Sequence, residues 1–351
     1  MCLNPLVSKP KVTIVVVNWK TPRLLAGSLR SLLADPNSNQ FEIVVVDNNS
    51  GDESVEMLRR DFPQVQTIAN TENVGFSKAC NQVIPDAKGE YVLLLNPDTV
   101  VVDCAVSKMA EYMDRNPECA SVGPKVLNAD GSLQLACRRS FPNPAAAFFR
   151  LSYLSFLFPK HPVVAKYNLT NADPDKEIDV DALSGSAMMV RKTVIDEIGL
   201  LDDDIYMFGE DIDWCWRFKE AGYAVRYYPE AVVYHYHGAS SRFRRVGTTI
   251  FLHKGMEVFY RKHLSKRYWA PFNWAVYAAI WSRAGVFILI SLLKQALPDK
   301  SAGVFERDIA PGQSALPPSA RVDAPKVEAL NAEPAAEKEL MLASPANASE
   351  Q

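Results

Sequence analysis

Residues 12–21 read VTIVVVNWKT and decide the fold. The run at 12–17 is apolar without alternation, which is typical of a parallel strand covered on both faces. FEIVVV at 41–46 and YVLLL at 91–95 repeat this pattern, residues 65–69 form a shorter candidate strand, and helix-like stretches occupy 22–33 and 76–84. Strand–helix–strand repetition predicts a Rossmann-like α/β fold, with a mostly parallel sheet and helices on both faces.

The second half of the chain is less regular. Its patterns predict strands at 186–190, 225–228 and 231–236, and helices at 192–198 and 211–221. The second of these helices is expected to end at Gly222, because glycine commonly terminates helices.

Composition excludes several classes of protein. With 38 basic and 41 acidic residues the net charge is −3, whereas a protein that binds many nucleic-acid phosphates is expected to be basic. The six cysteines form no C-x-x-C pair, and no signal peptide precedes Lys11, so we expect a cytoplasmic location. No G-x-G-x-x-G follows the first strand, which argues against a dinucleotide site.

The C-terminal region changes character twice. Residues 264–297 are basic and then apolar. Asn273 and Arg283 interrupt the apolar pattern, and the charge-free run at its end, 284–293, has ten residues, which is too short to span a bilayer alone. This pattern predicts a helix lying in the plane of the inner membrane surface, with packing on the protein's own core as the open alternative. Residues 298–351 contain seven prolines and one aromatic residue, and are expected to be disordered.

Polar residues follow each of the three main strands. These are Asn18 and Trp19, then Asp47 and Asn48, then the sequence Asn-Pro-Asp at 96–98. Ligands bind at the carboxyl ends of the strands in such sheets, so we expect the three clusters to meet at one crevice. Each cluster alone is also compatible with an ordinary turn, and a carboxylate at a strand end suits a hard divalent cation.

Three further clusters lie in the second half. His235 and His237 are two residues apart, so an extended segment would direct both to one face. Residues 209–213 read GEDID at a helix start, where acidic residues favour the helix dipole and where a carboxylate could also act as a general base. A third cluster could bind phosphate or remain solvated; it consists of Arg242, Arg244 and Arg245.

Together these stretches resemble glycosyltransferase family 2, particularly its bacterial rhamnosyltransferase-like members. The resemblance spans residues 11–263 and is carried by VTIVVVNWKT, VVVDNNSGD at 44–52, NVGFSKACN at 73–81 and YVLLLNPDT at 91–99. It continues through LSGSAMMVRKTVIDEIGLLDDDIYMFGEDIDWCWRFKEAGYAVRYYPEAVVYHYHGAS at 183–240. The long block around 209–217 followed by a His-x-x-Gly-x-Ser pattern is the most specific part.

The resemblance implies a GT-A fold, a nucleotide-diphosphate sugar donor, Mg²⁺ or Mn²⁺, and inversion at the anomeric carbon. On this chain it implies Asp211 as the base beside Glu210, and Asp98 with His235 as metal ligands, His237 being the second choice for the histidine. The implied nucleotide-binding residues are Asn18, Trp19, Asp47, Asn48, Asn73 and Asn96. The acceptor or phosphate groups would contact Ser184, Gly185, Arg242, Arg244 and Arg245.

These expectations define an inverting glycosyltransferase of cell-envelope polysaccharide synthesis, peripheral on the inner face of the membrane, with rhamnose as the first candidate sugar. Its acceptor would be a saccharide or a lipid-linked saccharide. The expected organisation is an N-terminal arm at 1–10, a catalytic domain at 11–263, a membrane segment at 264–297 and the tail. The catalytic domain is divided into a nucleotide-binding half (11–100) and an acceptor and catalytic half (101–263). A sugar nucleotidyltransferase and an inactive nucleotide-sugar-binding protein remain as alternatives. A nucleotidyltransferase would need a glycine-rich phosphate loop after the first strand, and this sequence lacks those glycines.

Overall fold

The computed structural model describes residues 9–142, 167–236 and 245–296. The chain divides into two units, Met1–Leu297 and Pro298–Gln351. The expected disordered tail and most of the expected N-terminal arm lie outside the described residues. The following paragraphs therefore concern the first unit.

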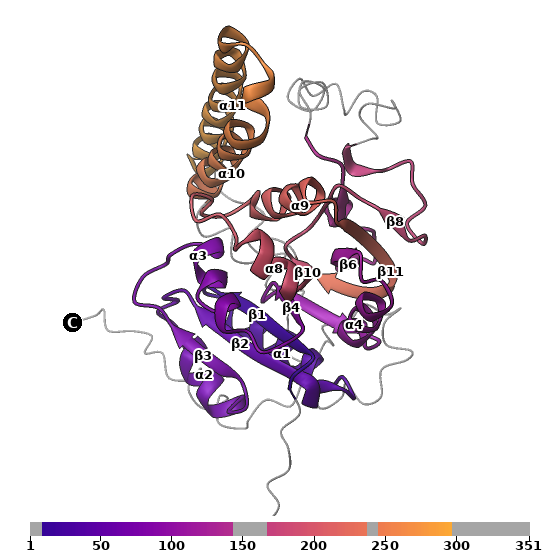
Figure 1. Cartoon of the computed structure of the whole chain (residues 1–351). Helices are drawn as coiled ribbons and strands as arrows, with labels where there is room; N and C mark the ends of the chain where they lie inside the picture. Colours follow the sequence, from indigo (N-terminus) through magenta and orange to yellow (C-terminus); the bar gives the residue numbers. More distant parts are fainter. Residues whose placement is uncertain (1–8, 143–166, 237–244, 297–351) are drawn as a thin grey trace, which may run out of the picture. The chain divides into compact units, whose positions relative to one another are not determined.

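A nine-stranded sheet forms the centre of this unit, in the order β3-β2-β1-β4-β10-β6-β11-β5, with β8 paired to β11 (Figure 1). Strands β1–β4, β6 and β11 run in one direction, whereas β5, β8 and β10 run in the opposite one. The predicted α/β fold with a mostly parallel sheet is therefore confirmed. The strands are β1 Val12–Asn18, β2 Phe41–Asp47, β3 Gln66–Ala69, β4 Tyr91–Leu95, β5 Thr99–Val102, β6 Cys119–Leu127, β8 Ile178–Asp179, β10 Ala187–Arg191 and β11 Ala224–His235, and a separate pair comprises β7 Arg138–Arg139 and β9 Ala182–Leu183.

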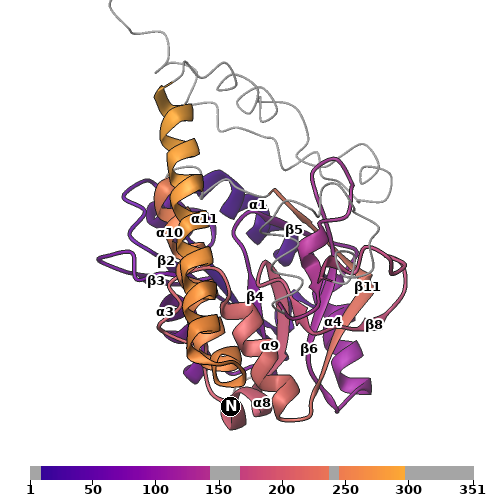
Figure 2. The ribbon, with the colours of Figure 1, turned by 90° about the horizontal axis from the view of Figure 1, so that it is seen from above.

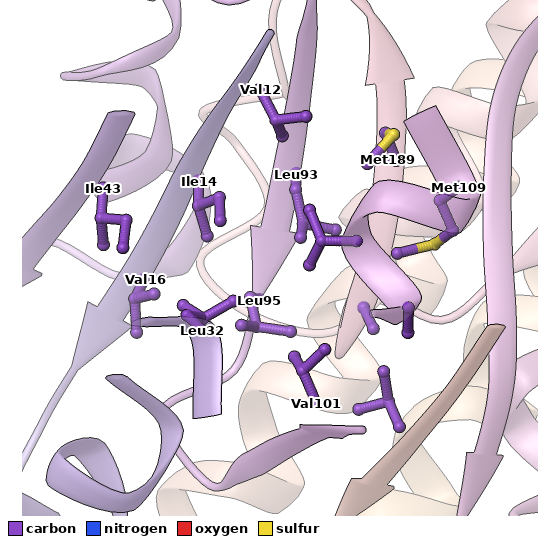
Figure 3. Packing of buried hydrophobic residues seen from close by; sticks show 14 of the residues in the cluster. Val12, Ile14, Val16, Leu32, Ile43, Leu93, Leu95, Val101, Met109 and Met189 are labelled. Carbon is purple, nitrogen blue, oxygen red and sulfur yellow. The ribbon is translucent and has the colours of Figure 1, made fainter. Parts of the chain in front are cut away.

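Helices cover both faces of the sheet, and this explains the absence of alternation in the strands. Ile14 and Val16 of β1 pack into a core that α1 and α4 also line (Figure 3), while Val15 and Val17 pack into a second core with α3 and α9. Successive side chains of a strand point to opposite faces, so apolar residues are needed at every position. The helices are α1 Pro22–Leu33, α2 Ser54–Asp61, α3 Phe76–Asn81, α4 Ala105–Arg115, α8 Lys192–Ile198, α9 Glu210–Glu220, α10 Arg245–Phe259 and α11 Ala270–Ala296.

Two element boundaries differ from the sequence prediction. The runs at 225–228 and 231–236 are one strand, β11, whose pairing with β6 shifts register between Tyr228 and Val232. Pro229 lies in this irregular stretch and has no N–H to donate to the ladder. The helix predicted at 76–84 ends at Asn81, before a short 3₁₀ turn at Ile84–Asp86, because Pro85 has no N–H to donate to the carbonyl oxygen of Asn81.

The order of the strands determines where a ligand can bind. From β1 the chain continues outward through β2 and β3, then returns to place β4 on the other side of β1. The carboxyl ends of β1 and β4 therefore lie at a topological switch point, where open α/β sheets leave a crevice.

Helices α10 and α11 form a hairpin whose two members lie side by side in both views (Figures 1 and 2). A π-helical turn at Tyr260–Leu264 and a 3₁₀ turn at Ser265–Arg267 precede α11. Most of α11 is exposed, including Trp274, Leu289 and Leu293, and Ala270–Leu293 is long and apolar enough to cross a membrane. One side of α11, including Ile280 and Ala284, is buried against the protein, whereas most of its surface is exposed.

The helix is longer than the ten-residue run 284–293 because it continues through Arg283. Arg283 Nη1 donates a hydrogen bond to Nε2 of His253 on α10 at 2.8 Å. The guanidinium therefore lies against the other helix of the hairpin, and the apolar stretch continues past it.

Candidate active site

One pocket lies at the carboxyl ends of β1, β2 and β4. Trp19, Asn48 and Asp98 each line it from a different strand end, so the three polar clusters do converge. The pocket-lining residues are Val17, Trp19, Asn48, Asn73, Gly75, Phe76, Asn96, Pro97, Asp98, Tyr206, Met207, Thr248 and Phe251.

Asn18 and Asp47 do not line this pocket; they hold its loops. Both are buried, and Asn18 Nδ2 donates to Asp47 Oδ2 at 2.8 Å. Asp47 also accepts hydrogen bonds from the backbone N–H and the hydroxyl of Ser50, and Asn18 Nδ2 reaches Ser54 Oγ at 3.0 Å. The network fixes the turn after β2 against the end of β1 and so supports the neighbouring Trp19 and Asn48.

Asn48 and Asn73 are positioned by the loop before α3. Asn48 Nδ2 donates to the carbonyl oxygen of Gly75 at 3.0 Å, and Asn73 Oδ1 accepts from the Tyr206 hydroxyl at 2.7 Å. Gly75 has φ +89°, and a Cβ there would lie 2.6 Å from the Tyr206 carbonyl oxygen. The close approach therefore requires glycine. Neither Gly75 nor Tyr206 was identified as a site residue from the sequence.

Asp98 and His235 meet at the other end of the pocket. Pairing of β5 with β11 aligns Thr99 with His235, and His235 Nε2 lies 3.1 Å from Asp98 Oδ1. His235 Nδ1 is 2.8 Å from Gln134 Oε1, whose own amide Nε2 donates to Asn128 Oδ1. Because Oε1 only accepts, Nδ1 donates this hydrogen bond, and Nε2 is directed toward the Asp98 carboxylate and the Asn96 amide.

This donor set fits a divalent cation. His235 Nε2 and Asp98 Oδ1 lie 3.1 Å apart, close enough to bind one cation together. A carboxylate oxygen and an imidazole nitrogen with its second nitrogen held by a hydrogen bond are typical ligands of Mn²⁺. The described residues contain no group of three or more His, Cys, Asp or Glu suited to a metal, so substrate oxygens would have to complete the coordination.

Asp211 and Glu210 begin α9 side by side, both buried. Asp211 Oδ2 accepts hydrogen bonds from Arg139 Nη2 at 2.6 Å and from the Gly185 backbone N–H at 3.0 Å. Glu210 Oε2 has no hydrogen-bond partner among the described residues. Arg139 therefore holds the carboxylate of Asp211, the predicted base, in place. No local motif around Arg139 indicated this contact.

Burial changes the protonation of Glu210. The loss of solvent, and after it the charge of Asp211, raise the pKa of Glu210 to about 8. Glu210 is therefore mainly protonated at pH 7, which does not suit it to accept a proton there.

The segment 184–186 connects the carboxyl groups of α9 with the end of β4. The Asn96 N–H donates to the Ser186 carbonyl oxygen at 2.9 Å, and the Ser184 and Ser186 hydroxyls are 3.0 Å apart. Gly185 contacts Asp211 as described above, so Ser184 and Gly185 lie between the two chemically distinct ends of the site.

Several predicted residues are not brought into this arrangement. His237, Arg242 and Arg244 lie outside the described residues, and Arg245 is described only as the first residue of α10. Asn96 lines the pocket, but its Nδ2 faces His235 Nε2 at 3.2 Å, so it acts as a hydrogen-bond donor there.

Comparison with protein families matches residues 10–247 to the model described as glycosyltransferase like family 2. Among curated proteins, the N-acetylglucosaminyl-diphospho-decaprenol L-rhamnosyltransferase of Mycobacterium tuberculosis is 24% identical over 261 residues. That match covers 71% of this chain and 84% of the relative. The low-salt glycan biosynthesis hexosyltransferase of Haloferax volcanii is 26% identical, over 59% of this chain and 61% of its own length.

Solved structures bear out the fold. A mannosyltransferase from Pyrobaculum calidifontis, in complex with GDP-Man and Mn²⁺, matches with a TM-score of 0.50 and 15% identity. The match covers 87% of this chain and 81% of that one. The predicted GT-A type of α/β fold is confirmed by this likeness.

Proposed function

Because the chain belongs to glycosyltransferase like family 2 and is a glycosyltransferase that uses a nucleotide sugar, we propose that it transfers its sugar with inversion to a lipid-linked saccharide during cell-envelope polysaccharide synthesis. A rhamnosyl donor is the first candidate, since the mycobacterial relative is a rhamnosyltransferase. That relative also acts on a diphospho-decaprenol acceptor, which supports a lipid-linked acceptor here.

One observation carries the proposal. Hydrogen bonds through Asn96 and the segment 184–186 link the Asp98–His235 pair, whose Asp98 lines the pocket, to Asp211 at the start of α9. A cation-binding end and a proton-accepting end beside one pocket are what displacement of a diphosphate by a hydroxyl requires.

Asp98 and His235 would hold Mn²⁺ or Mg²⁺, which when bound neutralises the charge that builds on the departing diphosphate. Trp19 is suited to stack on the base, with Asn48 and Asn73 as hydrogen-bonding partners of the nucleoside. Asn18 and Asp47 support these residues indirectly through the turn at Ser50.

Asp211 accepts the proton of the acceptor hydroxyl as that oxygen attacks the anomeric carbon from the side opposite the diphosphate. Arg139 and the Gly185 N–H hold one carboxylate oxygen in place, and this leaves the geometry of the base fixed. Protonated Glu210 contributes no negative charge of its own beside this base at pH 7.

We further propose that α11 attaches the enzyme to the inner membrane surface, where the lipid-linked acceptor resides. Exposed apolar residues cover much of α11, and Trp269, Trp274 and Trp281 are suited to the headgroup boundary. The division into a catalytic domain (11–263, with halves 11–100 and 101–263) and a membrane segment (264–297) follows from this proposal.

The experiment is a donor panel. Full-length enzyme is incubated with dTDP-, UDP- and GDP-sugars, Mn²⁺ and a polyprenyl-diphosphate-linked saccharide, and the acceptor is examined for added sugar by mass spectrometry. Transfer from at least one donor is expected. Binding without transfer from any donor would favour the inactive binding protein, and formation of a nucleotide sugar from a sugar phosphate would favour the nucleotidyltransferase.

A further inference from the structure

Helix α10 forms one wall of the pocket at the strand ends. Thr248 and Phe251 line it together with Trp19, Asn73 and Tyr206. The match to the family model ends at residue 247. This wall is therefore supplied by a part of the chain that follows the matched region.

Phe251 is fixed by an aromatic contact. Its ring stacks on Tyr206 with a centroid separation of 4.2 Å and an interplanar angle of 26°. The Tyr206 hydroxyl donates to Asn73, so Phe251 packs on the residue that holds the loop before α3. Together with Trp19 and Phe76, these two residues give the pocket four aromatic side chains, which suits a flat base more than a bare diphosphate.

Close backbone packing holds α10 against the start of α9. A Cβ on Gly255 would lie 2.0 Å from the carbonyl oxygen of Phe208, which no real contact allows. Phe208 has φ +70° and Gly209 has φ +105°, and both immediately precede Glu210. The helix can therefore approach the entry to α9 this closely only because residue 255 is glycine.

An ion cluster after α10 strengthens this packing. The fully buried Asp213 of α9 accepts hydrogen bonds from Lys262 at 2.8 Å, His263 at 2.7 Å and Arg217 at 2.9 Å. Burial alone would raise its pKa, but the His263 hydrogen bond and the neighbouring cations outweigh it and lower the pKa to about 2. Asp213 therefore remains charged and ties α9 to the turn between α10 and α11.

We propose that α10 is part of the donor-binding site and that Phe251 and Thr248 contact the nucleoside. The close packing of Gly255 on Phe208 holds these two side chains at the pocket. The inference rests on the proposed function, which assigns a nucleotide sugar to this pocket. The hairpin therefore has a role in donor binding that is separate from membrane attachment.

The test measures binding to the full-length protein in detergent by calorimetry, with UDP, dTDP and GDP as probes, each with Mn²⁺. For the probe that binds wild type most tightly, Phe251→Ala should weaken binding about fivefold to tenfold. Leu252→Ala is the matched control, because Leu252 is the next residue and is 39% exposed, and it should bind like wild type. Phe251→Leu, which keeps most of the apolar volume, guards against a folding defect and should show an intermediate loss.

A glycine pair tests the packing. Gly255→Ala should weaken binding of the same probe at least fivefold, because α10 must move away from Phe208. Gly285→Ala on α11, where a Cβ would meet nothing within 4 Å, should have no effect. Inorganic diphosphate with Mn²⁺ should bind equally to wild type and Phe251→Ala, since it lacks the nucleoside.

The outcomes are distinguishable. If wild type binds none of the three nucleoside diphosphates, the proposed function fails and this inference fails with it. If wild type binds but Phe251→Ala and Gly255→Ala bind equally well, the inference alone is overturned. An equal loss of inorganic diphosphate binding in Phe251→Ala would also overturn the nucleoside contact.

Discussion

Asp211 and Arg139 form an ion pair at 2.6 Å inside the protein, between the start of α9 and strand β7. The pair occupies only one carboxylate oxygen, which Gly185 also contacts. The second oxygen, Oδ1, accepts one hydrogen bond from the Ile212 backbone N–H at 2.8 Å, so both oxygens of the carboxylate are held in place.

Replacing Asp211 by Asn should abolish proton acceptance without removing hydrogen-bonding capacity. We expect turnover to fall by roughly 10²–10⁴ while donor affinity stays within about twofold. Steady-state kinetics together with donor binding measures both. Glu210→Gln is the comparison variant and should retain much more activity; a collapse in Glu210→Gln alone would move the base to Glu210.

The raised pKa of Glu210 predicts how stability changes with pH. Its pKa is about 8 in the folded protein and near 4.5 in the unfolded chain, so between these values the folded state binds more protons. This contribution to stability is present below pH 4.5 and is lost as the pH rises through 8. Glu210→Gln has no carboxyl group to titrate at this position. Between pH 5 and 8 its free energy of unfolding should therefore fall less than that of wild type, and the two decreases should differ by about 1 kcal/mol or more. Denaturant unfolding at several pH values measures this, and parallel pH profiles would contradict it.

Asp98→Ala should remove Mn²⁺-dependent transfer by at least about 100-fold while leaving the thermal unfolding midpoint near that of wild type. Asp98 lies at the end of a strand and faces the pocket, outside both hydrophobic cores. Asp61→Ala, which removes an exposed carboxylate paired with Arg60 on α2, is the control and should remain active. Activity that survives exhaustive chelation in wild type would refute the cation assignment.

Gln134 should act through His235. Gln134→Ala leaves the imidazole tautomer and ring orientation unconstrained, and we expect Mn²⁺ affinity to fall about 10–100-fold. Gln134→Glu keeps an acceptor at the same place and should restore most of the affinity. Mn²⁺ titration followed by electron paramagnetic resonance distinguishes the variants, and equal affinity in wild type and Gln134→Ala would exclude this role.

Much of the fold could be predicted from local pattern, because β1, β2 and β4 need apolar residues on both faces and so lack alternation. The meeting of Trp19, Asn48 and Asp98 followed from the general rule for strand ends. The indirect role of Asn18 and Asp47 did not follow, since polar residues after a strand look alike whether they face a ligand or each other.

The remaining site residues depend on long-range contacts. Arg139 lies 72 residues before Asp211, and Gln134 lies 101 residues before His235. No local spacing marks either pair. Phe251 belongs to an ordinary apolar stretch, and its place in the pocket depends on the packing of Gly255 against Phe208, which no periodicity encodes.

Exposed residues of α11 should determine membrane binding. Leu289→Lys combined with Leu293→Lys adds two charges to residues that are each 58% exposed, and should lower the fraction bound to vesicles by several-fold. Leu200→Lys, at an exposed position outside the hairpin, should bind as wild type does. Vesicle flotation provides the measurement. Unchanged binding by the double variant would show that α11 does not attach the enzyme.

The central claim is that a hydroxyl displaces a nucleoside diphosphate directly from the donor with Asp211 as the base. The most direct test is the product stoichiometry of one reaction, with labelled donor, Mn²⁺ and polyprenyl-diphosphate-linked acceptor. The account predicts one nucleoside diphosphate released for each sugar gained by the acceptor, with inverted anomeric configuration, and neither product from Asp211→Asn. Release of a nucleoside monophosphate with sugar phosphate, retention of configuration, or transfer by Asp211→Asn at the wild-type rate would contradict it.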